Sequence, residues 1–421
     1  MKILRTPAYC YPELIASSHL EEDKLKAFAE AGIETVIYAP TPTRGIDAET
    51  YNKYKTIKYE ERENGCVKIN RFSMFREGRN PILRAVRYVL VNFLQYRKGV
   101  KSRDIDVVFG SSTPPTQGIL NALVAKKLSK KQKRKVPLVY NLQDVFPDSL
   151  VTTGLTKKGS LLWKIGRKIE NYTYKNADKI IVISESMKQN ILEKGVPEEK
   201  IVVVSNWIDT EATEPVAKED NRLFEEFGIS KDKFIVLYAG NFGKAQGADV
   251  VLSAAEKLKE NENIQFVVFG GGQGFEAAKN LVLEKQLNNV IINPLLPQER
   301  VAEVYSLGDV AIITCKKGVG TSGMPSKTWS IMACNTPIVA AFDTESELAD
   351  VIGKADAGVA VEPENAEALV QAILEMSNGK AKNFDGGREY VLENASKEIC
   401  VAKYVDTIKS VCGKEEECVT V

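Results

Sequence analysis

The sequence predicts an α/β protein with two domains, each built on a parallel, doubly wound sheet. Apolar runs typical of buried strands alternate with helical segments along the chain, and this alternation favours parallel sheets covered by helices. The length of 421 residues exceeds one ordinary core. Residues 1–205 hold 36 Lys and Arg against 22 Asp and Glu, a net charge of +14, whereas residues 206–421 carry −13. Opposite charges in the two halves indicate domains with different partners.

Composition excludes several classes of protein. No apolar run is long enough for a transmembrane helix, and Arg5 and Pro7 interrupt the N-terminus where a signal peptide needs its apolar core. Seven scattered cysteines without a CxxC pair favour neither a disulfide framework nor a zinc site. The single histidine, His19, excludes His-triad catalysis and His-rich metal sites. We therefore expect a cytoplasmic protein with reduced thiols, and no recognisable module indicates nucleic-acid binding.

The first half is predicted as alternating strands and helices joined by polar segments. In chain order we expect a helix at 19–31, a strand at 33–40, an irregular segment with a short hairpin at 41–78, a helix at 81–101, a strand at 105–112, a helix at 117–128, a solvated basic loop at 126–135, a strand at 136–144, a helix at 160–176, and strands within 177–186 and 196–211.

Two features of this half carry functional hypotheses. Asp144 ends the strand at 136–144, where open α/β sheets place their ligands, although it could equally cap the turn before Pro147. Helix 81–101 has an apolar face flanked by Arg and Lys. That helix is either packed on the core with a solvated basic edge or a surface helix that rests on anionic lipid.

The second half begins after a polar linker near 210–232 and repeats the strand–helix pattern. Three glycine-rich turns, at 240–247, 270–274 and 318–323, each follow a predicted strand. The carboxyl ends of parallel strands share one edge of a sheet, so we expect these turns to converge on one crevice. Further strands are expected within 289–297, 309–314, 336–342 and 358–361, followed by a helix started by Pro363 and Asn365 and a final helix near 395–412.

The stretch 316–342 is the strongest single signal for a ligand. Gly318, Gly320 and Gly323 precede a predicted helix that begins near Pro325 and carries Lys327 in its first turn. Free N–H groups of such a turn can bind an anion, and a cation there is unfavourable unless an anion offsets the helix dipole. The stretch therefore indicates a phosphate site, although many glycine-rich turns before helices bind nothing.

Seven passages carry a resemblance to a known family. They are SSTPPTQG, NLQDVFPDSLVTTG, IENYTYKNADKIIVIS, VVVSNWID, YAGNFGKAQGADVVLSAA, VFGGGQGFE and GMPSKTWSIMACNTPIV. In this order they resemble the GT-B-fold glycosyltransferases of family 4, retaining enzymes that use nucleotide sugars, and most of all the bacterial surface-polysaccharide branch of the colanic-acid and fucosamine transferase type. The resemblance implies two Rossmann-like domains facing each other across a cleft. Residues 1–207 would bind the acceptor, residues 208–395 would bind the nucleotide sugar, and a C-terminal helix within 396–421 would cross back to the first domain.

The resemblance also implies a set of site residues. Lys327 and Lys244 would neutralise the donor diphosphate, and Asp144 would lie at the sugar or acceptor. The remaining substrate-binding positions would be Gly240, Asn241, Gln246, Gly271, Gly272, Gly320, Thr321, Ser322, Gly323, Met324, Pro325, Ser326, Ser330, Ser17 and Gln143.

Several of these positions depart from the family pattern. Ser322 and Ser330 replace two glutamates, Asn241 and Gln246 replace an arginine and a lysine, and Gln143 replaces a histidine. Ala16, Ser17 and Ser18 stand where a glycine pair is usual. The diphosphate is then neutralised mainly by lysines and backbone N–H groups. Gly270, Gly271 and Gly272 also allow close packing, and Glu276 fits a helix-dipole partner.

The implied function is transfer of a sugar, with retention, from a UDP-linked hexose or N-acetylhexosamine to a growing, lipid-linked surface-polysaccharide acceptor. No metal or cofactor is expected, and the basic half predicts peripheral contact with the anionic inner face of the membrane. Two alternatives remain at this stage. One is a non-catalytic nucleotide-sugar-binding homologue, which the serines at 322 and 330 favour. The other is a sugar-nucleotide 2-epimerase, which a chain with one histidine fits poorly.

Overall fold

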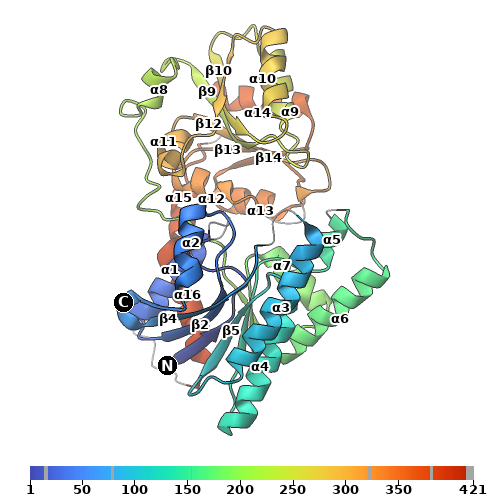
Figure 1. Cartoon of the computed structure of the whole chain (residues 1–421). Coiled ribbons are helices and arrows are strands. Elements are labelled where there is room, and N and C mark those ends of the chain that lie inside the picture. The colour runs from blue at the N-terminus through green and yellow to red at the C-terminus, as the bar shows by residue number, and fades with distance from the viewer. Residues whose placement is uncertain (14–17, 77–79, 153, 321–323, 380–382, 414–421) are drawn as a thin grey trace. The chain divides into compact units, whose positions relative to one another are not determined.

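The computed structural model describes residues 1–13, 18–76, 80–152, 154–320, 324–379 and 383–413. The chain divides into an N-terminal unit, residues 1–205 and 400–421, and a C-terminal unit, residues 206–399. Each unit holds one sheet whose neighbouring strands run parallel, apart from one antiparallel edge pair (Figure 1). The predicted α/β class with two doubly wound sheets is confirmed.

The sheet of the N-terminal unit has eight strands in the order β3-β4-β2-β1-β5-β6-β7-β8. Only β3 is antiparallel to its neighbour, β4. The order reverses between β1 and β5, which places a topological switch point there. The strands are β1 (Lys2–Arg5), β2 (Glu34–Pro40), β3 (Tyr59–Arg62), β4 (Val67–Phe72), β5 (Val107–Ser111), β6 (Leu138–Leu142), β7 (Lys179–Val182) and β8 (Ile201–Val203).

Helices cover both faces of this sheet. On one face, α3, α4, α6 and α7 pack over a core formed by alternate residues of β5, β6 and β7. On the other face, Phe28 of α1 and Tyr404 of α16 pack against Phe109 of β5. The helices are α1 (Ser18–Glu30), α2 (Ala48–Thr56), α3 (Pro81–Gly99), α4 (Thr116–Gln132), α5 (Asp148–Thr152), α6 (Leu161–Asn176), α7 (Glu185–Glu193) and α16 (Lys397–Ser410).

Two predictions for this unit are wrong in part. The segment 41–78 was expected to be irregular, but it contains α2, which Asp47 caps by accepting a hydrogen bond from the Thr50 N–H at 2.6 Å. Only Tyr54 of that helix is buried, so its sequence shows little apolar periodicity. The basic loop expected at 126–135 is instead the last two turns of α4 for most of its length, because Lys and Gln are good helix formers.

Helix α16 is held in the N-terminal unit by a buried polar cluster. The Tyr404 hydroxyl donates to Asn141 Oδ1 at 3.0 Å, and the Lys24 Nζ lies 5.0 Å from the centre of the Tyr404 ring. Lys24 pairs with Glu21 at 2.5 Å, and Arg5 also contacts Glu21. Burial alone would raise the pKa of Glu21, but Arg5 and Lys24 outweigh it and lower that pKa to about 2. The helix therefore covers charges that would otherwise face water.

The sheet of the C-terminal unit has six parallel strands in the order β11-β10-β9-β12-β13-β14. Numbered within the unit this order is 3-2-1-4-5-6, the arrangement of dinucleotide-binding sheets, and it reverses between β9 and β12. The strands are β9 (Phe234–Asn241), β10 (Ile264–Gly271), β11 (Val290–Pro294), β12 (Val310–Thr314), β13 (Ile338–Ala341) and β14 (Gly358–Val361).

Successive residues of these strands point to opposite faces and build two cores. One core joins β9, β10, β12 and β13 to α8, α11, α12, α13 and α15, and the other joins the same strands to α9, α10 and α14. The helices are α8 (Leu223–Glu226), α9 (Asp249–Lys257), α10 (Phe275–Glu284), α11 (Val301–Tyr305), α12 (Lys327–Ala333), α13 (Glu347–Lys354), α14 (Ala366–Ser377) and α15 (Gly387–Asn394). The sequence did not predict α13 or α15.

We predict that replacing Tyr404 by Ala destabilises the N-terminal unit by about 3–5 kcal/mol, because it removes a fully buried ring and its hydrogen bond. Tyr404→Phe is the matched control and should cost only about 1 kcal/mol, since it loses the hydroxyl alone. Urea unfolding of the full chain measures both changes. An unfolding midpoint of Tyr404→Ala equal to that of the wild type would show that α16 does not stabilise this unit.

Candidate functional site

Three glycine-rich turns meet at the carboxyl edge of the sheet in the C-terminal unit. They follow β9, β10 and β12, which are adjacent in the sheet. The Phe242 N–H donates to the Gly271 carbonyl at 2.7 Å, and the Lys316 N–H donates to the Ala245 carbonyl at 3.0 Å. Backbone hydrogen bonds thus join all three turns at the topological switch point, where open α/β sheets bind their ligands.

A pocket of about 540 Å³ opens at this switch point, within the C-terminal unit. This volume suits a small-molecule ligand. It is lined by seven of the residues predicted from the sequence, namely Gly240, Asn241, Gln246, Met324, Pro325, Ser326 and Lys327. The lining also includes Ala239, Ala245, Leu295, Tyr305, Thr314, Cys315, Val319 and Phe342, which were not predicted.

Lys327 is the cation of this pocket. It is the first residue of α12, and its Nζ donates to the Ala239 carbonyl at 3.3 Å, at the end of β9. The same Nζ lies 4.5 Å from the centre of the Tyr238 ring. Desolvation lowers the pKa of Lys327 to about 8, and within the described residues no carboxylate forms an ion pair with it. A half-buried ammonium group without a carboxylate partner is suited to bind an anion.

The surroundings hold this lysine in place. Tyr238 is fully buried, and its hydroxyl donates to the Asn241 carbonyl at 3.1 Å, so the ring is fixed at the end of β9. A β-carbon added to Gly240 would lie 2.9 Å from the Lys327 Nζ. Glycine is therefore required at position 240 for the ammonium group to approach the strand so closely.

Part of the N–H cradle predicted from the sequence, residues 321–323, lies outside the described residues, and in the described part of the turn after β12 three N–H groups already have acceptors. Asp343, two residues beyond β13, accepts hydrogen bonds from the Gly318 N–H at 2.9 Å and the Gly320 N–H at 2.8 Å. Glu364 accepts from the Lys317 N–H at 3.1 Å. These donors are occupied by the protein's own carboxylates. In the described part of the turn, positive charge available to a ligand comes from Lys327.

The glycines of the turn after β10 allow close packing, which is one of the two roles that the sequence predicted for them. A β-carbon on Gly272, which has a φ of +89°, would overlap the Asn241 side chain at 1.7 Å. One on Gly271 would lie 3.1 Å from Leu295. Neither Gly271 nor Gly272 is among the residues that line the pocket. Both glycines support the pocket from outside by letting Asn241 and Leu295 approach the turn.

Of the other predicted residues, some do not line this pocket and some lie outside the described residues. Lys244 is exposed on the turn after β9, and Ser330 is buried in α12; neither lines the pocket. Gly320 contacts Asp343 and the Phe342 ring rather than the pocket. Thr321, Ser322, Gly323 and Ser17 lie outside the described residues.

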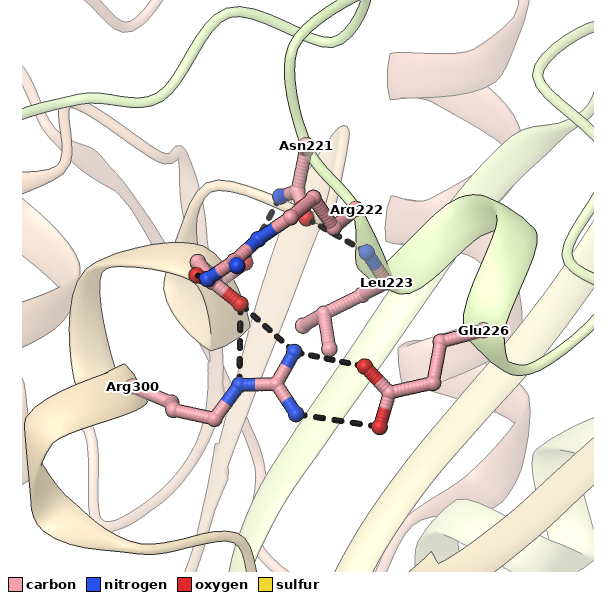
Figure 2. Close-up of polar contacts among 6 residues, drawn as sticks. Asn221, Arg222, Leu223, Glu226 and Arg300 are labelled. Carbon is pink, nitrogen blue, oxygen red and sulfur yellow. Dashed lines mark hydrogen bonds and ion pairs between the residues drawn. The ribbon is translucent and has the colours of Figure 1, made fainter.

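A charged network supports the segment that supplies Leu295 and Tyr305 to the pocket. Figure 2 shows Arg300 facing Glu226 of α8, and Arg300 also forms an ion pair with Glu303 of α11. The Arg300 guanidinium donates to Glu226 at 3.0 and 2.7 Å and to Glu303 at 2.9 and 2.7 Å. Asn221 donates to the Glu303 carbonyl at 2.7 Å. This network anchors α11 to the start of the C-terminal unit.

Asp144 and Gln143 lie in the N-terminal unit, after β6. The Asp144 carboxylate accepts a hydrogen bond from the Ser149 hydroxyl at 3.0 Å. Desolvation raises the pKa of Asp144, and the Ser149 hydrogen bond opposes the rise. Gln143 donates through its backbone to Ser112 Oγ and through its side chain to Asn141 Oδ1, both at 3.0 Å.

Sequence reasoning missed Tyr238, whose ring contacts Lys327, and Asp343, which binds the turn after β12. Asp343 follows a predicted strand and is polar, so the rule that drew attention to Asp144 could have found it. Tyr238 lies inside an apolar strand and gives no such signal. Among the described residues, no group of three or more His, Cys, Asp or Glu could hold a metal ion.

Two family descriptions match the chain. "Glycosyltransferase Family 4" matches residues 22–212, and "Glycosyl transferases group 1" matches residues 219–397. The chain is 27% identical to the probable glycosyltransferase WbjE of Pseudomonas aeruginosa over 82% of its own length and 85% of WbjE. It is 28% identical to WcaI of Escherichia coli, a glycosyl transferase provisionally assigned to colanic acid biosynthesis, over 64% of this chain and 67% of WcaI.

Solved structures share the fold. The Anabaena protein HepE in complex with UDP aligns with a TM-score of 0.69 and 14% identity over 97% of this chain and 100% of HepE. Another HepE structure holds UDP-glucose and aligns with a TM-score of 0.64 and 14% identity over the same shares. Together with the family matches, these alignments confirm the predicted resemblance and the GT-B fold.

We predict that Asp343→Ala frees the turn at Gly318 and Gly320, because both N–H groups lose their acceptor. Hydrogen exchange of these two amides, followed by mass spectrometry or NMR, should accelerate by at least about tenfold. Glu345→Ala, an exposed acid two residues away, is the control and should leave both amides unchanged. Unchanged exchange in Asp343→Ala would contradict the role of this carboxylate.

Proposed function

The chain belongs to the nucleotide-sugar glycosyltransferases of family 4 with the GT-B fold, and from this premise we propose what it transfers, to what and with which residues. The donor is a UDP-linked hexose or N-acetylhexosamine, and the acceptor is a growing, lipid-linked surface polysaccharide. The sugar is transferred with retention of its anomeric configuration and without a metal ion. The C-terminal unit binds the donor and the N-terminal unit binds the acceptor.

The observation that carries this proposal is the half-buried ammonium group of Lys327 in a glycine-lined pocket at the switch point of a 3-2-1-4-5-6 sheet. A diphosphate in that pocket would supply the negative charge that the ammonium group lacks. The UDP and UDP-glucose held by HepE support a UDP-linked donor for a chain of the same fold. WcaI and its assignment to colanic acid support a surface-polysaccharide acceptor.

The chemistry requires little covalent participation by the protein. The bond between the anomeric carbon and the donor phosphate oxygen breaks, and the acceptor hydroxyl oxygen bonds to the same face of the sugar. The acceptor proton passes to the departing diphosphate, so no protein base is needed. The main requirement is stabilisation of charge that develops on the leaving oxygens. Lys327 would supply it, and its effect is largest in the transition state.

The remaining predicted residues receive secondary roles in this proposal. Asn241, Gln246 and Ser326 would hydrogen-bond the donor within the pocket that they line. Lys244, exposed on the turn after β9, would approach the diphosphate from that turn. Asp144 and Gln143, with the predicted Ser17, would serve the acceptor or sugar from the N-terminal unit.

Peripheral membrane contact through α3 fits a lipid-linked acceptor. Val86, Val89, Leu90 and Phe93 form an exposed apolar stripe on α3, with Val89 66% exposed. The helix contains no acidic residue. Phe75, Leu90 and Phe93 line a groove of about 460 Å³ beside this stripe. No helix within the described residues is long and apolar enough to cross a bilayer.

Nucleotide sugars tested one at a time by thermal shift identify the donor, because a ligand raises the melting temperature of the state that binds it. Turnover is then measured as nucleotide released with and without a lipid-linked acceptor. Release that requires the acceptor supports the transferase, an epimerised nucleotide sugar supports the 2-epimerase, and binding without either product supports the non-catalytic homologue. A chain that no UDP-sugar stabilises would refute the proposed donor site.

We predict that Lys327→Met lowers kcat/KM for the donor by about 100-fold or more, since it removes the cation beside the leaving diphosphate. Lys316→Met is the matched control, because Lys316 is exposed on the same turn and is ion-paired with Glu364 at 3.7 Å. It should change kcat/KM by less than about twofold. Steady-state kinetics with the identified donor measure both. Equal values for Lys327→Met and wild type would place the diphosphate elsewhere.

We also predict an alkaline limit to donor binding. The pKa of Lys327 lies near 8 in the ligand-free chain, so the ammonium form is complete below that pH and is lost as pH rises through it. The profile of kcat/KM, which reports the free enzyme, should therefore fall above about pH 8. In the donor complex the diphosphate raises this pKa, so kcat should fall at higher pH. The limit should disappear in Lys327→Met.

A further inference from the structure

A second exposed amphipathic surface lies in the N-terminal unit, on α6 and the turn before it. We define the leucine–lysine patch by Leu155, Leu161, Leu162 and Ile165 together with Lys157, Lys158, Lys164 and Lys168. Leu155 is 73% exposed and Leu161 76% exposed, and Leu162 and Ile165 are half exposed. Four large aliphatic side chains in water within eleven residues indicate a surface that another partner covers.

These side chains are exposed because the opposite face of α6 is already packed. A β-carbon on Gly166 would lie 2.6 Å from the Pro147 side chain, so this part of the helix is in close contact with the segment after β6. Glu170, one turn further, is buried and accepts from Lys194 and from the Tyr174 hydroxyl, both at 2.8 Å. Rotating α6 to hide its leucines would break these contacts. The apolar face therefore stays outward.

The charges in the chain segment that carries the leucines are of one sign. Between Asp148 and Glu170 the sequence contains no acidic residue, whereas it contains five Lys and Arg. On α6, Lys164 and Lys168 are one turn apart and flank Leu161 and Ile165. Lysines beside aliphatic groups can extend to lipid phosphates while the aliphatic groups enter the acyl boundary. A nucleic acid would need exposed aromatic rings, but Trp163 is half-buried and has Arg167 against its ring.

From this geometry we propose that the leucine–lysine patch inserts into the surface of an anionic lipid bilayer, as a contact separate from the stripe on α3. The proposal rests on the proposed function only for its purpose, which is to bring the N-terminal unit to a lipid-linked acceptor. Helix α4 packs against both α3 and α6, so the two surfaces belong to one helical layer of this unit (Figure 1). Contact through both the α3 stripe and the leucine–lysine patch would fix the orientation of the unit on the bilayer. Contact through one helix alone would not fix it.

The test is flotation of the full chain with vesicles of phosphatidylcholine mixed with phosphatidylglycerol, and with vesicles of phosphatidylcholine alone. Wild type should bind the anionic vesicles, and binding should weaken with salt. The double variant Leu161→Gln, Leu162→Gln should lower the partition coefficient by at least about tenfold. Lys157→Gln with Lys158→Gln should lower it by about fivefold per lysine at low salt.

Matched controls come from the C-terminal unit. Leu283→Gln replaces a leucine that is 75% exposed on α10, and Lys354→Gln replaces an exposed lysine on α13. Neither should change vesicle binding. All variants should keep the wild-type melting temperature within error, because the replaced side chains are exposed. The donor-induced thermal shift should also be unchanged, since the proposed donor pocket lies in the other unit.

Three results would overturn the proposal. The first is vesicle binding by Leu161→Gln, Leu162→Gln equal to that of wild type while Val89→Gln, Phe93→Gln on α3 abolishes it. The second is no binding of wild type to anionic vesicles. The third is a wild-type dimer in sedimentation that the α6 variant converts to monomer, which would assign the patch to a second copy. Loss of the donor-induced shift in wild type would instead refute the proposed function, whatever the vesicles show.

Discussion

The position of the Lys327 ammonium group is the constraint on which the candidate site depends. An ammonium group that is half-buried at the end of β9 loses part of its hydration. Its contacts with the Ala239 carbonyl and the Tyr238 ring replace only some of the lost hydration. The pKa of Lys327 is lowered because this lost hydration is not fully replaced. The neighbouring residues allow the ammonium group to lie at this position. Gly240 leaves room for the Lys327 Nζ because it has no β-carbon, and Tyr238 is fixed by its own hydrogen bond. An anionic ligand would compensate for the lost hydration.

Asp343 accepts hydrogen bonds from backbone N–H groups of the turn after β12, which could otherwise bind an anion. Backbone N–H groups of a glycine-rich turn can bind phosphate, but here Gly318 and Gly320 donate to a carboxylate from the neighbouring strand end. The carboxylate holds the turn in place without a ligand, so the pocket is shaped in advance. In the proposed donor site, the charged side chain that would attract an anion is Lys327, whose charge depends on pH.

Much of this arrangement was predictable from the sequence, for identifiable reasons. Strong apolar strands with glycine-rich turns predicted the sheet of the C-terminal unit, and the structure brings three of the predicted residues, Lys327, Gly240 and Gln246, together at one pocket. Polar α2 carries little apolar periodicity, and it was missed. Tyr238 could not be assigned, because it lies inside an apolar strand and its contact with Lys327 joins segments far apart in sequence. Asp343 follows a predicted strand and was overlooked. Lys244 was expected beside Lys327; it is exposed on the turn after β9 and is not among the residues that line the pocket.

Lys327 and the lysines of the leucine–lysine patch differ in burial, and we propose different functions for them. In the C-terminal unit, whose sequence is acidic, Lys327 is desolvated, and its proposed partner is one ligand at short range. In the N-terminal unit, the lysines at 157, 158, 164 and 168 keep their hydration and lie beside exposed leucines. Their attraction to an anionic surface is weak for each lysine, additive and screened by salt. The two proposed tasks differ accordingly: the single desolvated ammonium group of Lys327 would bind the donor diphosphate, and the exposed lysines of the basic half would bind a lipid surface reversibly.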